Sequence, residues 1–312
     1  MALDVLALRA LGLGDLLTAV PALRALQDLG AGVTVAAPPP LAPLIALAGC
    51  AHVPAHPLQP LPPQARGAEL LVNLHGRGPQ SHGVALAAHP RRLVAFRHAD
   101  VPATATFPVW RADEHEVVRW CRLLEESGIP ADPSRLGLPV PPLPRRLAHA
   151  RRAVVVHPGA ASGARRWPAE RFAAVAAAIS ADDQARVVIT GGPGERRLAE
   201  RVAQLAGLDD EAVLAGRTDL LELAAVVGHA TGVVCGDTGV AHLATAFAVP
   251  SIVIFGPTSP AHWGPPDDPR HRVLWAGRIG DPHADAPHAG LLEIAPDDVL
   301  DALHPDPLRS PT

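Results

Sequence analysis

Short apolar runs separated by helix-like segments mark the first part of the chain. Four of these runs are continuous, as expected of buried parallel strands, and they cover residues 4–9, 32–37, 69–74 and 92–96. Apolar residues recur at helical spacing over 15–29, where Pro21 marks either a kink or the true start of the helix. An amphipathic helix is predicted at 113–128, ending at Gly128. The pattern predicts an α/β domain.

The same alternation starts again after residue 152. Two predicted strands, each followed by a loop, lie in 153–160 and 185–192. Two more predicted strands lie at 231–235 and 251–255. The predicted helices lie at 168–180, 194–207 and 220–230, with one more opening after Cys235. Strands that alternate with helices imply a second parallel sheet. Beyond Gly264 the chain is rich in Pro, Asp and His, which predicts loops and one closing helix at 295–304.

A segment rich in proline and arginine, 139–152, separates the two patterns and is the predicted linker. We therefore expect an N-terminal domain at 1–145 and a C-terminal domain at 146–312, with the option that the last helix packs back on the N-terminal domain. The predicted fold class is α/β, with two doubly wound parallel-sheet, Rossmann-like domains facing a central cleft. Ligands of such sheets bind outside the carboxyl ends of the strands.

Composition narrows the function classes. The 312 residues are 48% hydrophobic and 19% charged with a net charge of -4, so the chain lacks the basic excess of a nucleic-acid-binding protein. Its cationic side chains are arginines and histidines, because the sequence contains no lysine. The cysteines, Cys50, Cys121 and Cys235, are too far apart for a C-x-x-C metal site or a disulfide framework. No export signal and no uncharged apolar run of about 18 residues occurs, which predicts a cytoplasmic protein without a transmembrane segment.

The stretch "CGDTGVAHLATA" runs from a predicted strand into a predicted helix. Asp237, Thr238 and Gly239 lie where free backbone N–H groups and the positive end of the helix dipole converge, a geometry that binds phosphate. Alternatively, Asp237 or Thr238 only caps the helix and His242 is a surface residue of its first turn.

Three further loops follow predicted strands of the second domain. In "HPGAASGARRWPAERF", Ser162 and Arg165 suit a diphosphate, or else the loop is an ordinary helix start. In "TGGPGERRLAE", Glu195 either accepts hydrogen bonds from the hydroxyls of a ribose or simply caps a glycine-rich turn. The last loop is "FGPTSPAHWGP". If the strands are parallel, all four loops lie at the same edge of the second sheet.

The first loop of the chain, in "ALGLGDLLTAVPAL", contains Gly12 and Gly14 but lacks the third glycine of the dinucleotide fingerprint. The chain also lacks the G-K-[ST] sequence of a P-loop. These two absences weaken the hypotheses that the protein binds a nicotinamide cofactor or ATP. Asp15 remains as a carboxylate at the tip of the first strand. It is either a general base or an acidic start of the helix.

Three ordered segments carry a family resemblance. "LRALGLGDLLTAVPALRAL" is similar to an R-x-x-G-x-G-D opening motif, and "HPGAASGARRWPAERF" to a P-G-A-x-x-x-x-K-x-W-P segment. The longest block is "AGRTDLLELAAVVGHATGVVCGDTGVAHLATAFAVPSIVIFGPT". Together they resemble glycosyltransferase family 9, the heptosyltransferase family of lipopolysaccharide core assembly, and the likeness runs from Ala7 to about Pro266.

The resemblance implies a GT-B fold whose C-terminal domain holds a nucleotide-sugar, with ADP-heptose favoured, and whose N-terminal domain presents the acceptor. It implies an inverting displacement without metal or other cofactor, in which Asp15 removes the proton of the acceptor hydroxyl, with Gly12 and Gly14 in the acceptor-side loop. The residues that it assigns to the nucleotide-sugar are Ser162, Arg165, Glu195, Asp237, Thr238, Gly239 and His242.

Two departures from the family pattern concern the charge of one side chain and the acceptor. Arg165 stands where the family has lysine, and because the chain has no lysine at all we treat the charge as retained. The weakly patterned segment 37–64 lies where the first domain should shape the acceptor pocket.

The expected acceptor is a cell-envelope glycan such as lipopolysaccharide core, with peripheral attachment to the inner face of the membrane if the acceptor is lipid-linked. The alternatives are sugar transfer to a small secondary metabolite or another glycoconjugate, and a nucleotide-binding homologue that has lost transfer activity.

Overall fold

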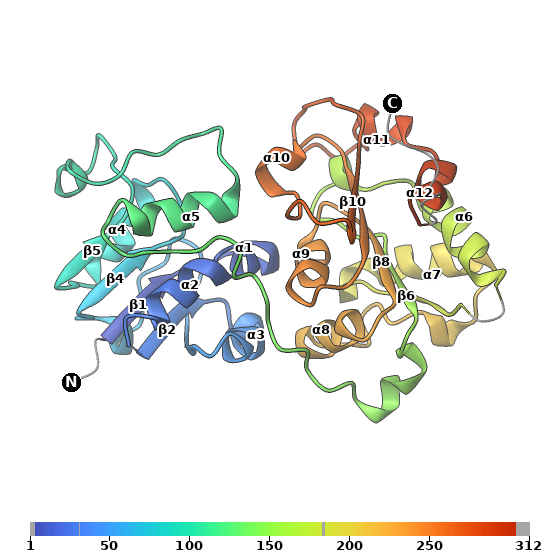
Figure 1. Ribbon diagram of the computed structural model, residues 1–312, viewed down its shortest axis with the longest axis horizontal. Helices are drawn as coiled ribbons and strands as arrows, with labels where there is room; N and C mark the ends of the chain where they lie inside the picture. Colours follow the sequence, from blue (N-terminus) through green and yellow to red (C-terminus); the bar gives the residue numbers. More distant parts are fainter. Residues whose placement is uncertain (1–3, 31, 183–184, 304–312) are drawn as a thin grey trace. The chain divides into compact units, whose positions relative to one another are not determined.

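The computed structural model describes residues 4–30, 32–182 and 185–303 (Figure 1). The chain folds as two compact units, Met1–Pro139 and Val140–Thr312. Each unit is built on one five-stranded sheet whose strand pairs are all parallel. The prediction of two doubly wound α/β domains is therefore confirmed.

The first sheet has the strand order β3-β2-β1-β4-β5. Its strands are β1 (Asp4–Leu8), β2 (Gly32–Ala37), β3 (Ala51–Pro54), β4 (Leu70–Asn73) and β5 (Arg92–Val94). β1 pairs with β2 on one side and with β4 on the other, so the strand order reverses between β1 and β4. In an open parallel sheet this reversal point is where ligands bind. The loops after β1 and β4 are thus the expected functional loops of this unit.

The helices of the first unit follow the predicted pattern in part. They are α1 (Leu13–Thr18), α2 (Val20–Gln27), α3 (Ala42–Leu47), α4 (Gln80–Ala87) and α5 (Glu116–Glu125), with single 3₁₀ turns at Pro39–Leu41, Pro63–Ala65 and Pro102–Thr104. The predicted helix at 15–29 is two helices, because Pro21 lies in the first turn of α2, where its missing N–H costs nothing. Sequence reasoning missed α3 and β3, because the proline-rich segment 37–64 shows no clear period, and it set no bounds for α4.

The second sheet has the order β10-β9-β8-β6-β7. Its strands are β6 (Val154–His157), β7 (Val187–Ile189), β8 (Gly232–Gly236), β9 (Ser251–Phe255) and β10 (His271–Trp275). β8 and β9 are buried along their whole length, as their continuous apolar runs predict. β10 was not predicted, because it is an edge strand with exposed Arg272 and Val273 in a stretch that reads as polar.

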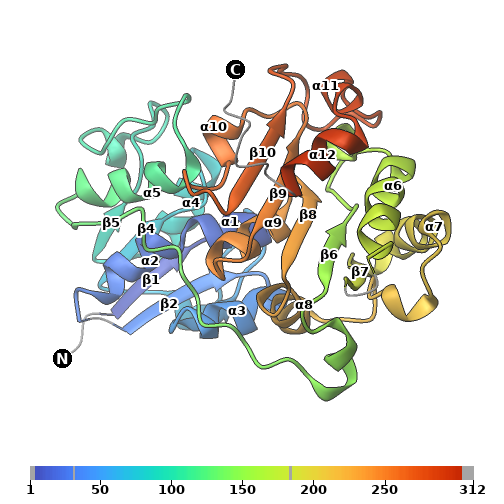
Figure 2. The same ribbon diagram turned by 45° about the vertical axis from the view of Figure 1, so that its right-hand side comes forward.

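Helices cover both faces of the second sheet, with α8 and α9 on one face and α6 and α7 on the other (Figure 2). They are α6 (Ala169–Ser180), α7 (Arg196–Ala206), α8 (Leu220–Gly228), α9 (Gly239–Ala246), α10 (Pro260–Trp263), α11 (Ala289–Glu293) and α12 (Pro296–Leu303), and 3₁₀ turns lie at Arg145–Ala150, Gly163–Arg165, Pro193–Glu195 and Asp210–Ala212. α12 packs on α6, β9 and β10 of its own unit, and residue 304 of its predicted range lies outside the described residues. No helix of the described residues is long and apolar enough to cross a membrane.

The boundary between the units lies six residues before the predicted one at 145/146. The chain after Pro139 already packs on the second unit. A Cβ atom at Gly228 would lie 2.5 Å from Val140 Cγ1, and the carbonyl of Pro141 accepts a hydrogen bond from His229 Nε2 at 3.2 Å. These contacts on the end of α8 assign the proline-rich segment to the second unit.

Candidate functional site

The four predicted loops of the second unit follow β6, β7, β8 and β9. Because these strands are parallel, the loops leave the sheet at the same edge, as predicted. The loop after β6 carries Ser162 and Arg165, the loop after β7 carries Glu195, and the loop after β8 carries Asp237 and Thr238. The sheet therefore places the residues that were predicted to bind the nucleotide-sugar along one edge.

Asp237 connects three of these loops. Its carboxylate is buried, 3.8 Å from the guanidinium of Arg165, and it accepts a hydrogen bond from Thr258 in the loop after β9. Burial raises the pKa of Asp237, and Arg165 and Thr258 oppose that rise. Thr258 was not among the predicted site residues, although its loop was. The buried carboxylate thus holds an arginine at the start of α9.

Two buried side-chain atoms beside Asp237 have no hydrogen-bond partner among the described residues, Arg165 Nε and Thr238 Oγ1. Thr238 is the N-cap of α9 but makes no side-chain capping bond, so the plain capping interpretation does not account for it. A buried polar group without a partner costs about 1–3 kcal/mol, and each such group in a folded protein calls for an explanation. Gly239 and His242 follow in the first turn of α9. The His242 ring makes an edge contact with the Trp263 ring, and the two ring centroids lie 6.1 Å apart.

Ser162 contacts a segment near the end of the chain. Its hydroxyl donates to the carbonyl of Pro282 at 2.6 Å, and its assignment to the nucleotide-sugar stays a prediction. Residues 276–288, between β10 and α11, pack on the loop after β6 so closely that a Cβ atom at Gly163 would lie 1.6 Å from the backbone oxygen of Asp285. No local sequence pattern indicates this contact, because the two segments lie about 120 residues apart.

Glu195 lies against the loop after β6. Its carboxylate accepts from the Gly192 amide at 2.7 Å, and a Cβ atom at Gly159 would come within 2.1 Å of Glu195 Oε1. Nearby, the buried His157 contacts Thr190 through Nδ1 and Oγ1 at 3.0 Å. Burial lowers the pKa of His157, while the charge of Glu195 opposes that change. Sequence reasoning missed His157, although it ends a strand directly before Pro-Gly.

In the first unit, Asp15 lies on α1, directly after β1, with 29% of its side chain exposed. Its Oδ2 atom accepts from the amide of Gly12, the N-cap, at 3.2 Å, and Gly14 lies within the helix rather than in the predicted turn. Its Oδ1 atom lies 3.3 Å from Arg9 Nη2. The carboxylate therefore caps α1 and is still accessible.

His75, in the loop after β4, lies near Asp15 and Arg9 and was also missed by sequence reasoning. Burial and the charge of Arg9 lower the pKa of His75, and the charge of Asp15 opposes them. Its Nδ1 atom is buried without a partner among the described residues. Across residues 4–30, 32–182 and 185–303, no group of three or more His, Cys, Asp or Glu side chains is placed to hold a metal ion. The three cysteines are free and buried.

The two doubly wound parallel sheets are the architecture of the GT-B class of glycosyltransferase folds, which this chain shares with solved heptosyltransferase structures. The model of glycosyltransferase family 9 (heptosyltransferase) matches residues 97–285, and the chain belongs to this family. The match includes the loops after β6 to β9, whereas the motif that contains Asp15 precedes it.

Curated relatives are similar over part of their length. Lipooligosaccharide heptosyltransferase 2 of Haemophilus influenzae is 31% identical over 159 residues, which are 47% of this chain and 45% of that protein. The chain thus spans about half the length of the curated relatives it matches.

Solved structures agree in fold over nearly the whole chain. The E. coli ADP-heptose lipopolysaccharide heptosyltransferase II has a TM-score of 0.76 and 21% identity, covering 96% of this chain and 97% of that one. An E. coli heptosyltransferase with ADP has a TM-score of 0.71 and 20% identity, covering 96% and 98%.

Proposed function

We propose that this protein is an inverting glycosyltransferase that moves a heptose from ADP-heptose to a hydroxyl group of a cell-envelope glycan such as lipopolysaccharide core. The second unit binds the donor and the first unit binds the acceptor. The observation that carries the proposal is the cluster of Arg165, Asp237 and Thr238 at the start of α9, in a chain whose curated relatives include heptosyltransferases. A cytoplasmic location, with peripheral attachment if the acceptor is lipid-linked, belongs to the same proposal.

The diphosphate binds at the N-terminus of α9. The backbone amides there and the helix dipole favour negative charge, and the unpartnered Thr238 Oγ1 and Arg165 Nε supply further donors. Asp237 keeps Arg165 in place from the buried side. Glu195, fixed by the Gly192 amide, accepts from the hydroxyls of the ribose.

The transfer is a single displacement. Asp15 takes the proton of the acceptor hydroxyl while the oxygen attacks the anomeric carbon, and the bond from that carbon to the diphosphate oxygen breaks on the opposite face. The electron pair of that bond leaves with ADP. Amides of α9, Arg165 and His242 stabilise the charge that develops on the departing diphosphate, which makes their contribution greatest in the transition state.

The first test is nucleotide binding measured by thermal shift. ADP at about 100 times its dissociation constant stabilises the protein by roughly 2.7 kcal/mol, and we expect ADP to exceed UDP, GDP and CMP, with the same shift in Mg²⁺ or EDTA. Arg165→Gln removes most of the ADP shift, whereas Arg197→Gln, an exposed position on α7, leaves it unchanged.

The second test adds ADP-heptose and a heptose-deficient core glycan and follows ADP release and glycan mass. A larger shift with UDP or GDP overturns the ADP-heptose donor but leaves the fold assignment. An ADP shift without transfer to the glycan contradicts the proposed acceptor, and no shift with any nucleotide contradicts the donor site as a whole.

A further inference from the structure

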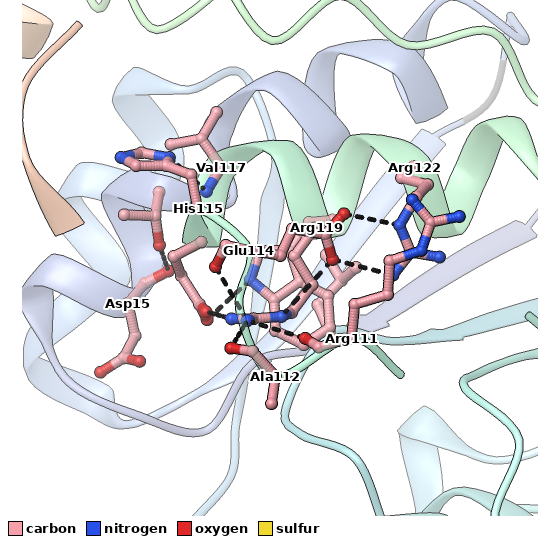
Figure 3. Close-up of polar contacts among 12 residues, drawn as sticks. Asp15, Arg111, Ala112, Glu114, His115, Val117, Arg119 and Arg122 are labelled. Atoms are coloured by element: carbon pink, nitrogen blue, oxygen red, sulfur yellow. Dashed lines mark hydrogen bonds and ion pairs between the residues drawn. The ribbon is translucent and has the colours of Figure 1, made fainter. Parts of the chain in front are cut away.

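Asp15 is the end of a line of alternating charges in the first unit. The line runs through ion pairs from Asp15 to Arg9, Glu116, Arg119, Glu114, Arg122, Glu126 and Arg111. Its middle is buried, with side-chain exposures of 1% for Arg9 and 7% for Glu116, whereas Arg111 at the far end is 60% exposed. Figure 3 shows Asp15 at one side of this set, Arg119 in the middle and Arg122 at the other side.

Hydrogen bonds and an aromatic contact hold the guanidinium of Arg9 in place. Its Nε atom donates to the Asp15 carbonyl at 2.8 Å, Nη1 donates to the Leu74 carbonyl, and Nη2 lies 3.2 Å from Thr18 Oγ1. The guanidinium also lies over the Trp120 ring, 4.7 Å from its centroid. A side chain held in this way offers Asp15 one defined contact point.

The same Nη2 atom is shared by two carboxylates. It lies 3.3 Å from Asp15 Oδ1 and 3.1 Å from Glu116 Oε1. An arginine that serves a single carboxylate often pairs with it through two parallel hydrogen bonds. The second carboxylate, from Glu116, balances the arginine, so that Arg9 orients Asp15 through one longer contact.

Glu116 is itself fixed on both oxygens. Oε1 also accepts from Trp120 Nε1 at 2.9 Å, and Oε2 pairs with Arg119. Arg119 in turn lies over the Trp110 ring at 4.3 Å. The position of Glu116 is therefore set by α5 and its aromatic neighbours rather than by Asp15.

We propose that Arg9 and Glu116 are positioning residues for Asp15: Glu116 holds the guanidinium of Arg9 in place, and Arg9 aims the carboxylate of Asp15. The inference rests on the proposed function, in which Asp15 is the base. The other oxygen of Asp15 is held by the Gly12 amide, so the two contacts together define the plane of the carboxylate.

The test is Glu116→Gln, which keeps the shape of the side chain and removes its charge. With ADP-heptose and a heptose-deficient core glycan, we expect kcat to fall by roughly 10- to 100-fold, while the KM for the donor stays the same. The loss falls on kcat and not on the donor KM, because Glu116 acts through Arg9 on the residue of the transfer step. A purely structural role for Glu116 would instead lower the melting temperature and leave kcat of the folded enzyme unchanged.

Glu126→Gln is the matched control. It makes the same chemical change at the exposed end of the line, where Glu126 pairs with Arg122 and Arg111, and it leaves kcat unchanged. If Glu116→Gln does not fold, Glu116→Asp keeps the charge and shortens its reach, and it gives an intermediate loss of kcat.

A readout without catalysis separates this inference from the proposed function. The carbon resonance of the Asp15 carboxyl group, compared by NMR at one pH, differs between Glu116→Gln and the wild type, because Arg9 is no longer held in the same place, and it is unchanged in Glu126→Gln. If the wild type transfers no sugar but the resonance still differs, the proposed function fails and the coupling of Glu116 to Asp15 stands. If transfer proceeds and both the rate and the resonance match the wild type, the inference is overturned.

Discussion

In the proposed mechanism, Asp15 uses one carboxylate for two purposes. Accepting from the Gly12 amide, it caps α1, which is the plain interpretation of an acidic residue in a first turn. Its other oxygen lies beside Arg9 and its side chain is accessible, as the proposed role of general base requires. The two interpretations left open by the sequence are compatible, because a capping carboxylate keeps lone pairs free.

Asp15→Asn separates these two roles. The amide oxygen of Asn still accepts from Gly12, so the helix and the ADP thermal shift are retained, but Asn takes no proton from the acceptor. We expect the transfer rate to fall by roughly 10²- to 10⁴-fold. The rate is measured as ADP release under saturating donor. A variant that binds ADP and transfers at the wild-type rate shows that another group is the base.

Some residues of the site could be read from the sequence and others could not. Asp237 and Thr238 lie between a strand and a helix, a local pattern that is visible in twelve residues. Arg9 and His75 come from loops after different strands, and their proximity follows from the β1–β4 pairing, which no local pattern encodes. The commitment of Ser162 to Pro282 was unpredictable for the same reason.

At the scale of elements, the loop after β6 and residues 276–288 pack so closely that only a glycine fits at position 163. The backbone oxygen of Asp285 occupies the place where a side chain at Gly163 would begin. The Ala164 amide donates to the carbonyl of Ala284 at 2.8 Å. The loop that carries Arg165 therefore takes its shape from a segment near the end of the chain.

Gly163→Ala tests this dependence. The added methyl group must displace backbone rather than a flexible side chain, so we expect destabilisation of about 1–3 kcal/mol and a weaker ADP thermal shift. Gly194→Ala is the control, because a Cβ atom there meets nothing within 4 Å. Equal melting temperatures and equal ADP shifts for the two variants would mean that the contact does not shape the loop.

Elements with strong apolar periodicity were predictable, and those that depend on their neighbours were not. β8 and β9 are covered on both faces and therefore read as continuous apolar runs. β10 has only one neighbouring strand, and β3 is a short edge strand after a proline-rich stretch, so neither carries that signature. The linker was found by composition, but its first residues joined the second unit through packing that composition does not report.

At the scale of the whole molecule, three buried histidines predict sensitivity to acid. His82, His157 and His271 are 0%, 7% and 9% exposed, and burial is the main cause that lowers the pKa of each below its ordinary value of 6.5. When the chain unfolds below that pH, these side chains take up protons that the folded protein does not bind. Protonation therefore favours the unfolded state.

The free energy of unfolding is accordingly level above about pH 6.5 and falls as the pH is lowered, by up to about 1.4 kcal/mol per pH unit for each histidine. Melting temperatures between pH 5 and 8 measure this. His271→Asn, which keeps a partner for Ser251, reduces the slope, and His56→Asn at an exposed position does not. A melting temperature that is constant from pH 7.5 to 5.5 contradicts the prediction.

The ion pair between Arg9 and Glu116 joins positions 107 residues apart in the sequence. Arg9 and Asp15 are present once β1 and α1 have been made, but the charge that balances Arg9 arrives only with α5, after all five strands of the first sheet. A chain interrupted before α5 would carry the aspartate without the surroundings that set its chemistry. In the proposed mechanism, the surroundings of the base are therefore complete only after the chain has been made through α5.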